Sequence, residues 1–202
     1  MMTRVGIIDY GMGNLHSVQK ALQTAGAQAE LTAEAQRLKQ FDKLVLPGVG
    51  AFGDAMSNLR ERELIDAIHD VVTAGTPLLG ICLGMQILFS ESEEMGHHLG
   101  LNILPGVVRR LCVSAKVPHM GWNQIQQRTA CPLFENVENG AFVYFANSYV
   151  VIPAQSAVIA GETDYDGTFT SVIWHENVYG VQFHPEKSER VGLQMLRNFV
   201  NL

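Results

Sequence analysis

Charged residues are scarce in this sequence, and their balance is negative. They make up 17% of the 202 residues, and 14 Lys plus Arg against 20 Asp plus Glu give a formal net charge of −6. A surface of that sign repels phosphate backbones, and no basic run offsets the repulsion. We therefore expect no nucleic-acid partner.

Long apolar runs are missing as well. No run approaches the ~20 residues that a bilayer-spanning helix needs. The apolar or small residues 5–8 end at Asp9, which makes this stretch too short for the apolar region of a signal peptide. The sequence therefore predicts a cytoplasmic protein without membrane attachment.

Cysteine is also rare, and its spacing is uninformative for metal binding. Cys82, Cys112 and Cys131 are odd in number and form no CxxC pair, which argues against a disulfide framework or a structural zinc site. The adjacent His97 and His98 do not converge on one ion in a regular strand or helix. We predict no metal site and no cofactor.

No repeat, low-complexity stretch or linker divides the chain, and 47% of its residues are hydrophobic, so we predict a single domain over residues 1–202. Continuous apolar runs at 5–8, 43–46 and 77–81 read as buried strands, and helical spacing follows the first of them. Residues 85–89 are also compatible with a helix. Buried strands alternating with helices are typical of a parallel sheet covered on both faces.

The second half of the chain has shorter, strand-like runs. Turn residues such as Asp166-Gly167 separate them, which indicates antiparallel hairpins added to the parallel sheet. Residues 191–200 fit one last amphipathic helix. The predicted fold class is α/β: an open, mixed, mainly parallel central sheet flanked by helices, with added antiparallel strands in the C-terminal half. The strand-like runs are 107–108, 142–145, 149–152, 171–174 and 178–181.

Cys82 stands between two glycines, Gly80 and Gly84, where a predicted strand meets a predicted helix. A nucleophile on such a sharp turn needs small neighbours, and the N-terminal end of the helix favours a thiolate. The backbone N–H of Leu83 is well placed to donate to an oxyanion. The alternative is a buried structural cysteine, because free cysteine behaves as a small hydrophobe.

His184 closes a strand-like run and is followed two residues later by Glu186. Residues i and i+2 of an extended segment project the same way, so Glu186 can orient an imidazole that exchanges a proton with the thiol. The order cysteine, histidine, acid differs from that of α/β-hydrolases, in which the acid precedes the histidine. The alternative is a His and a Glu held at a strand end by local hydrogen bonds.

Two motifs in this order resemble the class I (triad) glutamine amidotransferases, and the resemblance covers nearly the whole chain. Further segments, at 7–15, 46–52 and 118–123, look like the glutaminase subunits of imidazole glycerol phosphate synthases, which belong to histidine biosynthesis. The two motifs are Gly80-Ile81-Cys82-Leu83-Gly84-Met85-Gln86 and Val181-Gln182-Phe183-His184-Pro185-Glu186.

The resemblance implies the chemistry and the residues of a glutaminase. Cys82 attacks the side-chain amide of glutamine, His184 protonates the departing ammonia, and water hydrolyses the thioester to glutamate. Backbone N–H groups of Val49 and Leu83 form the oxyanion hole. The family commonly has histidine before the Ser/Thr-Tyr pair, where this chain has Asn147. The implied substrate-binding residues are Gly50, Gln86, Glu94, Ser148 and Tyr149; Glu94 is chosen over Glu91 and Glu93 by counting from Cys82.

The family also implies a partner. Free ammonia is protonated in water and lost, and this chain has no second domain to accept it. The resemblance names a (β/α)₈ cyclase subunit as the other half of a heterodimer, with Asn14, Trp122 and Lys187 at the interface. Three other readings stay open: the glutaminase of another synthase (anthranilate or aminodeoxychorismate type), a non-catalytic module of the same fold, and a cysteine hydrolase with another substrate.

Overall fold

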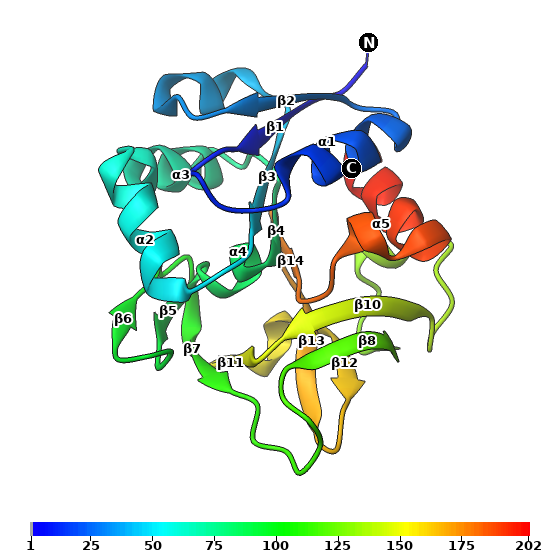
Figure 1. The fold of residues 1–202 in the computed structure, drawn as a ribbon. Coiled ribbons are helices and arrows are strands. Elements are labelled where there is room, and N and C mark those ends of the chain that lie inside the picture. Colours follow the sequence, from blue (N-terminus) through cyan, green and yellow to red (C-terminus); the bar gives the residue numbers. More distant parts are fainter. Residues whose placement is uncertain (1) are drawn as a thin grey trace.

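The computed structural model describes residues 2–202. Its centre is a twisted sheet whose first half is entirely parallel, in the order β2-β1-β3-β4-β14 (Figure 1). These strands are β2 (Gln28–Thr32), β1 (Arg4–Ile8), β3 (Lys43–Gly48), β4 (Leu78–Cys82) and β14 (Val178–Val181).

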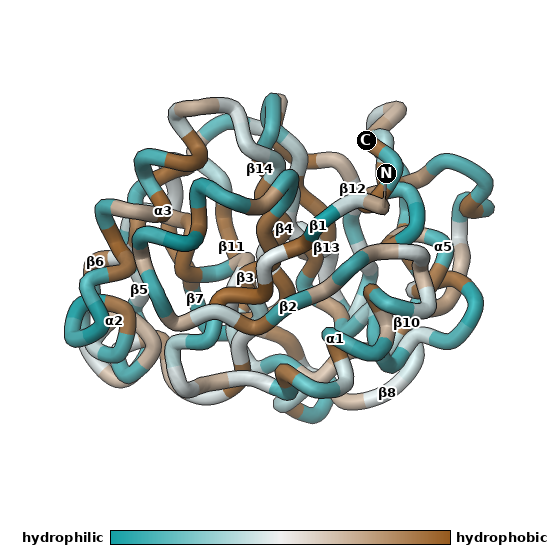
Figure 2. The backbone as a smooth tube through the Cα atoms, turned by 90° about the horizontal axis from the view of Figure 1, so that it is seen from above, coloured by the Kyte–Doolittle hydropathy of each residue, from teal (hydrophilic) through white to brown (hydrophobic). Residues whose placement is uncertain are grey.

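Helices cover both faces of the parallel half. One hydrophobic core lies under α1 and α5, and a second lies under α2, α3 and the short α4 (Figures 1 and 2). Over residues 2–202, no helix has the length and apolar content that crossing a membrane requires. The helices are α1 (Leu15–Thr24), α2 (Phe52–Glu61), α3 (Leu64–Thr73), α4 (Leu83–Gln86) and α5 (Glu189–Asn201).

The second half of the sheet is mostly antiparallel. It continues from β14 through β13, β11, β7, β5 and β6, while β12 and β9 pair beside β13 and a separate ribbon joins β8 to β10. The strands are β5 (Phe89–Ser92), β6 (His98–Leu99), β7 (Leu104–Arg110), β8 (His119–Gln124), β9 (Gln126–Gln127), β10 (Phe142–Asn147), β11 (Tyr149–Pro153), β12 (Ile159–Asp164) and β13 (Thr168–His175); the 3₁₀ turns are η1 (Ala35–Gln40), η2 (Pro132–Phe134), η3 (Ser156–Val158) and η4 (Pro185–Lys187).

The predicted fold class is confirmed, and so are the three buried strands and the hairpins of the second half. The helix-compatible reading of residues 85–89 is wrong beyond Gln86. Phe89 is fully buried and begins β5, where it pairs with Leu104 of β7. Sheet pairing outweighs helical spacing here, because α4 has only four residues and little stability of its own.

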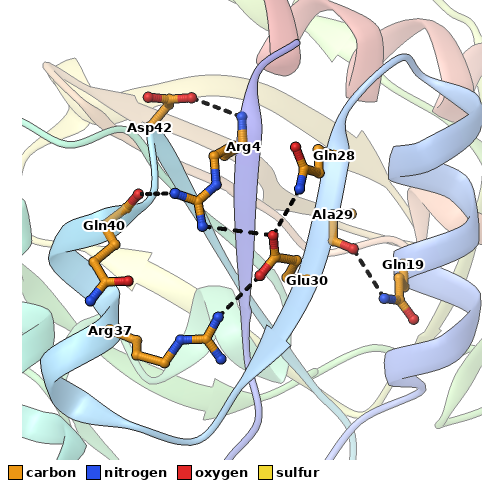
Figure 3. A network of polar contacts seen from close by, with 8 residues as sticks. All are labelled: Arg4, Gln19, Gln28, Ala29, Glu30, Arg37, Gln40 and Asp42. Carbon is orange, nitrogen blue, oxygen red and sulfur yellow. Dashed lines mark hydrogen bonds and ion pairs between the residues drawn. The ribbon is translucent and has the colours of Figure 1, made fainter.

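A cluster of charged side chains joins β2, β1 and η1 across one face of the sheet (Figure 3). Glu30 lies between two guanidinium groups, 3.7 Å from Arg4 and 3.1 Å from Arg37 (Figure 3). Both guanidinium groups also stand over the Phe41 ring, at 5.3 and 5.9 Å from its centroid. Partly exposed pairs of this kind contribute little to stability.

Asn198 of α5 holds the η2 segment against the helix. Its Nδ2 donates to the carbonyl oxygens of Leu133, at 2.8 Å, and Glu135, at 2.6 Å, and the residue is only 7% exposed. We expect Asn198→Asp to lower the free energy of unfolding by about 3 kcal/mol, because a carboxylate oxygen then faces two carbonyl oxygens, one of them buried.

Urea denaturation measures this loss, and Asn201→Asp is the matched control. Asn201 lies at the exposed end of the same helix, where the added charge costs less than about 1 kcal/mol. Equal losses in the two variants would contradict the role given to Asn198.

Candidate active site

Cys82 occupies a strained turn between β4 and α4. Its φ of 55° and ψ of −112° lie outside the regions that residues with a side chain normally adopt. A Cβ on Gly84 would lie 1.7 Å from the Leu46 carbonyl oxygen, and one on Gly80 would lie 2.7 Å from the Gly84 oxygen. The predicted sharp strand-to-helix turn is therefore present, and both flanking glycines are required by close backbone approach.

The topology brings His184 to the same place. β14 runs parallel to β4, with Val181 opposite Ile81, so the carboxyl ends of the two strands meet. His184 Nδ1 lies 2.8 Å from Glu186 Oε1, and their side chains are only 4% and 1% exposed. The two side chains that the i, i+2 spacing predicts to project the same way are therefore in contact, and the orienting role of Glu186 stays a prediction.

Three effects set the pKa of His184. Burial alone lowers it, but the hydrogen bonds and charges of Cys82 and Glu186 together outweigh burial and raise the pKa to about 9. The imidazole is therefore protonated at neutral pH, next to the sulfur. His184 can therefore act as a proton donor beside the sulfur.

A pocket of about 320 Å³ opens over the sulfur. Nine of the ten residues predicted for catalysis, the oxyanion hole and substrate binding line it, and the tenth, Glu186, stands behind His184. The lining residues are Val49, Gly50, Cys82, Leu83, Gln86, Glu94, Pro118, Ala146, Asn147, Ser148, Tyr149, His184 and Lys187.

Comparison with known proteins identifies the family. Residues 6–202 match the family model for glutamine amidotransferase class-I. The chain belongs to this family. The resemblance drawn from the sequence motifs is thereby confirmed.

Two curated relatives match almost end to end. Imidazole glycerol phosphate synthase subunit HisH of Syntrophotalea carbinolica is 50% identical over 200 residues, which cover 96% of this chain and 97% of the relative. The protein of the same name from Moorella thermoacetica is 50% identical over 201 residues, covering 100% and 96%. Among solved structures, PurLQS from Thermotoga maritima has a TM-score of 0.80 at 18% identity, covering 100% of this chain and 99% of that one, and it supports the fold alone.

The structure separates the three candidate glutamates of this class-I amidotransferase. Glu91 contacts the His97 ring and Glu93 pairs with Arg109, and neither glutamate lines the pocket, whereas Glu94 does. Glu94 Oε2 accepts a hydrogen bond from the Phe52 N–H, at 2.8 Å, at the first residue of α2. The positive end of the helix dipole holds this carboxylate at the pocket wall.

A chain of buried amides connects the pocket wall to the nucleophile. Gln86 Nε2 donates to the Tyr149 carbonyl, at 3.0 Å, and to Gln182 Oε1, at 3.1 Å. Gln182 Nε2 in turn donates to Cys82 Sγ, at 3.7 Å. Asn147, which stands where the family commonly has histidine, donates to the same Tyr149 carbonyl at 3.1 Å.

Gln182 received no role from the sequence, although a signal was present. It stands two residues before His184, and alternate residues of an extended segment face the same side.

Two of the three predicted interface residues, Trp122 and Lys187, lie against the same side chain, Tyr144. The Lys187 ammonium stands 5.9 Å from the centroid of the Tyr144 ring, and the exposed Trp122 ring contacts Tyr144 edge-on at 6.1 Å. Asn14 is exposed at the N-terminal end of α1. As for metals, no group of three or more His, Cys, Asp or Glu side chains within residues 2–202 is arranged to hold an ion.

We expect Gly84→Ala to lower the free energy of unfolding by about 3 kcal/mol, because the new methyl group overlaps the Leu46 carbonyl and the turn must move. Gly75→Ala is the control: Gly75 has a φ of +87°, but a Cβ there meets nothing within 4 Å, so only about 1 kcal/mol of backbone strain is added. Urea denaturation compares the two, and similar losses would show that the turn tolerates a side chain at position 84.

The pKa of His184 gives a second prediction. An NMR titration of the His184 ring should have its midpoint near pH 9 in the wild type and at a lower pH in Glu186→Gln, because the variant loses the carboxylate that stabilises the imidazolium.

The same shift affects stability. Since the folded pKa lies above the unfolded value, the proton on His184 stabilises the fold fully below about pH 6.5, and this contribution is lost as the pH rises through about 9. The free energy of unfolding should fall less between pH 6.5 and pH 9 in Glu186→Gln than in the wild type. An identical pH dependence in both proteins would contradict the coupling.

Proposed function

We propose that this chain is the glutaminase subunit of an imidazole glycerol phosphate synthase: it hydrolyses glutamine to glutamate and ammonia and passes the ammonia to a cyclase subunit in histidine biosynthesis. The observation that carries the proposal is Cys82 on its strained turn, facing the buried His184–Glu186 pair at the floor of a pocket. The relatives at 50% identity bear the name of that synthase subunit over nearly their whole length, which supports the choice of synthase.

The first half of the reaction forms a thioester. The Cys82 thiolate attacks the side-chain amide carbon of glutamine, and the carbonyl oxygen takes up negative charge. Backbone N–H groups of Val49 and Leu83, which both line the pocket, stabilise this oxyanion. As the carbon–nitrogen bond breaks, the His184 imidazolium donates its proton and ammonia leaves.

The second half releases glutamate. Neutral His184 takes a proton from a water molecule that attacks the thioester carbon, and the carbon–sulfur bond breaks to restore the thiolate and the imidazolium. Glu186 stabilises the imidazolium at both stages, because its carboxylate stays 2.8 Å from Nδ1 behind the reacting groups. Proton transfer of this kind contributes about 10²–10⁴-fold to the rate.

Glu94 suits the α-ammonium group of glutamine. Its Oε2 is held by the Phe52 N–H, so we assign Oε1 to the substrate cation. Ser148, Tyr149, Gly50 and Gln86 also line the pocket, and we assign them to binding the rest of the glutamine molecule.

An exposed apolar surface supports the docking of a partner. Trp122, Met120 and Phe142 on β8 and β10 are 47%, 65% and 54% exposed, which is unusual for such large side chains. Lys187 extends from this side into the pocket lining. We assign this surface, together with Asn14, to the (β/α)₈ cyclase subunit that receives the ammonia.

Glutamate release from glutamine tests the proposal, measured for the chain alone, with a cyclase subunit, and with the cyclase subunit plus its nucleotide ligand. We expect strong stimulation in the complete mixture, because the family keeps glutamine hydrolysis low until the partner binds its ligand. Cys82→Ser should fold with unchanged stability and lose at least about 10³-fold in rate, since a serine hydroxyl at this site is not ionised.

The outcomes separate the alternatives. Equal activity in all three mixtures would keep the glutaminase chemistry and assign the chain to another synthase. No glutamate release from the folded wild type in any mixture would overturn the enzymatic function. Full hydrolysis by Cys82→Ser would refute Cys82 as nucleophile.

A further inference from the structure

We propose that Gln182 is a positioning residue for the nucleophile: its buried side-chain amide donates an N–H to the Cys82 sulfur and thereby stabilises the thiolate and fixes its direction. The proposal deepens the glutaminase function proposed above and rests on it. Three features carry it: the orientation of the amide, its burial, and its place outside the substrate pocket.

The orientation of the Gln182 amide follows from a backbone carbonyl. The Tyr149 carbonyl oxygen can only accept, so the side-chain group of Gln86 that lies 3.0 Å from it must be the NH₂. The second hydrogen of that NH₂ is directed at Gln182, 3.1 Å away, and selects its oxygen. The NH₂ of Gln182 is therefore left facing the sulfur, at 3.7 Å.

Burial makes this donor effective. Gln182 is 0% exposed, and its main-chain N–H is fixed by the Ser171 carbonyl at 2.9 Å. With water excluded from the amide, the interaction with a negative sulfur is stronger than it would be in solution. The sulfur is thus contacted from two directions, by the neutral Gln182 amide and by the His184 imidazolium.

Gln182 is absent from the pocket lining formed by the described residues. A substrate in the pocket contacts Cys82 and Gln86 but not the amide between them, so Gln182 acts through the sulfur. This predicts an effect on the chemical step with little effect on glutamine binding.

Two substitutions separate the hydrogen bond from the packing. Gln182→Met keeps the length of the side chain and removes the N–H donor. Gln182→Glu keeps an oxygen for Gln86 but turns a second oxygen toward the thiolate. Asn198→Asp is the control, because it makes the same amide-to-acid change at a buried side chain that bonds to η2 and does not line the pocket. The urea experiment described above measures how much this substitution lowers the free energy of unfolding.

The first readout is the rate of Cys82 alkylation by iodoacetamide at pH 7, followed by mass spectrometry in the full-length chain. We expect Gln182→Met to slow alkylation of Cys82 about tenfold, because the thiolate loses its N–H donor. Gln182→Glu should slow alkylation further, because the thiolate then also faces a negatively charged carboxylate. Exposed Cys112 is the internal standard and should react equally in every variant.

The second readout is glutamine hydrolysis in the complex with the cyclase subunit and its nucleotide. For Gln182→Met we expect kcat to fall about tenfold with KM within about twofold of wild type, as for an interaction realised in the chemical step. A raised KM with unchanged kcat would instead make Gln182 a binding residue and overturn the proposal.

The alkylation assay tests the role of Gln182 independently of the glutaminase function, because alkylation of Cys82 needs no glutamine. Unchanged Cys82 alkylation in both Gln182 variants, or an equal slowing in Asn198→Asp, overturns the role of Gln182. If the wild type hydrolyses no glutamine while the Gln182 variants still slow alkylation, the glutaminase function fails and the role of Gln182 in positioning the sulfur is retained.

Discussion

The backbone conformation of Cys82 is the constraint on which the rest of the site depends. A residue with a side chain keeps a φ of 55° and a ψ of −112° only when its surroundings leave no alternative. β3 holds it from one side, where Gly48 pairs with Cys82, and β14 flanks β4 on the other. Because Gly84 has no side chain, α4 packs directly against the Leu46 carbonyl. The core of the parallel sheet maintains the strain, and Cys82 lies where this core borders the pocket.

Like the strained backbone of Cys82, the buried charges of His184 and Glu186 lower the stability of the fold. An imidazolium and a carboxylate that are almost entirely removed from water lose hydration, and apolar residues of the same size would often be more stable. The pair persists with short, direct contact, and the neighbouring Gln182, Gln86 and Tyr149 form a chain of neutral hydrogen bonds to the sulfur. At this cost in stability, the ion pair and the chain of amides surround the Cys82 sulfur.

The parallel and antiparallel halves of the sheet contribute different residues to the site. The parallel half brings Cys82 and His184 together, because the carboxyl ends of adjacent parallel strands share one edge. Ser148 and Tyr149, where the antiparallel half begins its β11 strand, also line the pocket. The separate β8–β10 ribbon, visible in Figure 1, carries the exposed Met120, Trp122 and Phe142. The surface that we assign to the partner therefore lies beside the proposed catalytic pocket, with Lys187 common to both.

The sequence by itself determined the parallel core strands, the turn at Cys82 and the pairing of His184 with Glu186, because continuous apolar runs, flanking glycines and i, i+2 spacing are local signals. It could not show that Phe89 leaves the helix for β5, since that depends on pairing with Leu104 far along the chain. Counting favoured Glu94, but only its position at the pocket wall, with Glu91 and Glu93 paired elsewhere, distinguishes the three glutamates. The role proposed for Gln182 also depends on the tertiary structure. The Tyr149 carbonyl on β11 orients the Gln86 amide, which in turn orients the Gln182 amide, and the sequence alone does not reveal such long-range contacts.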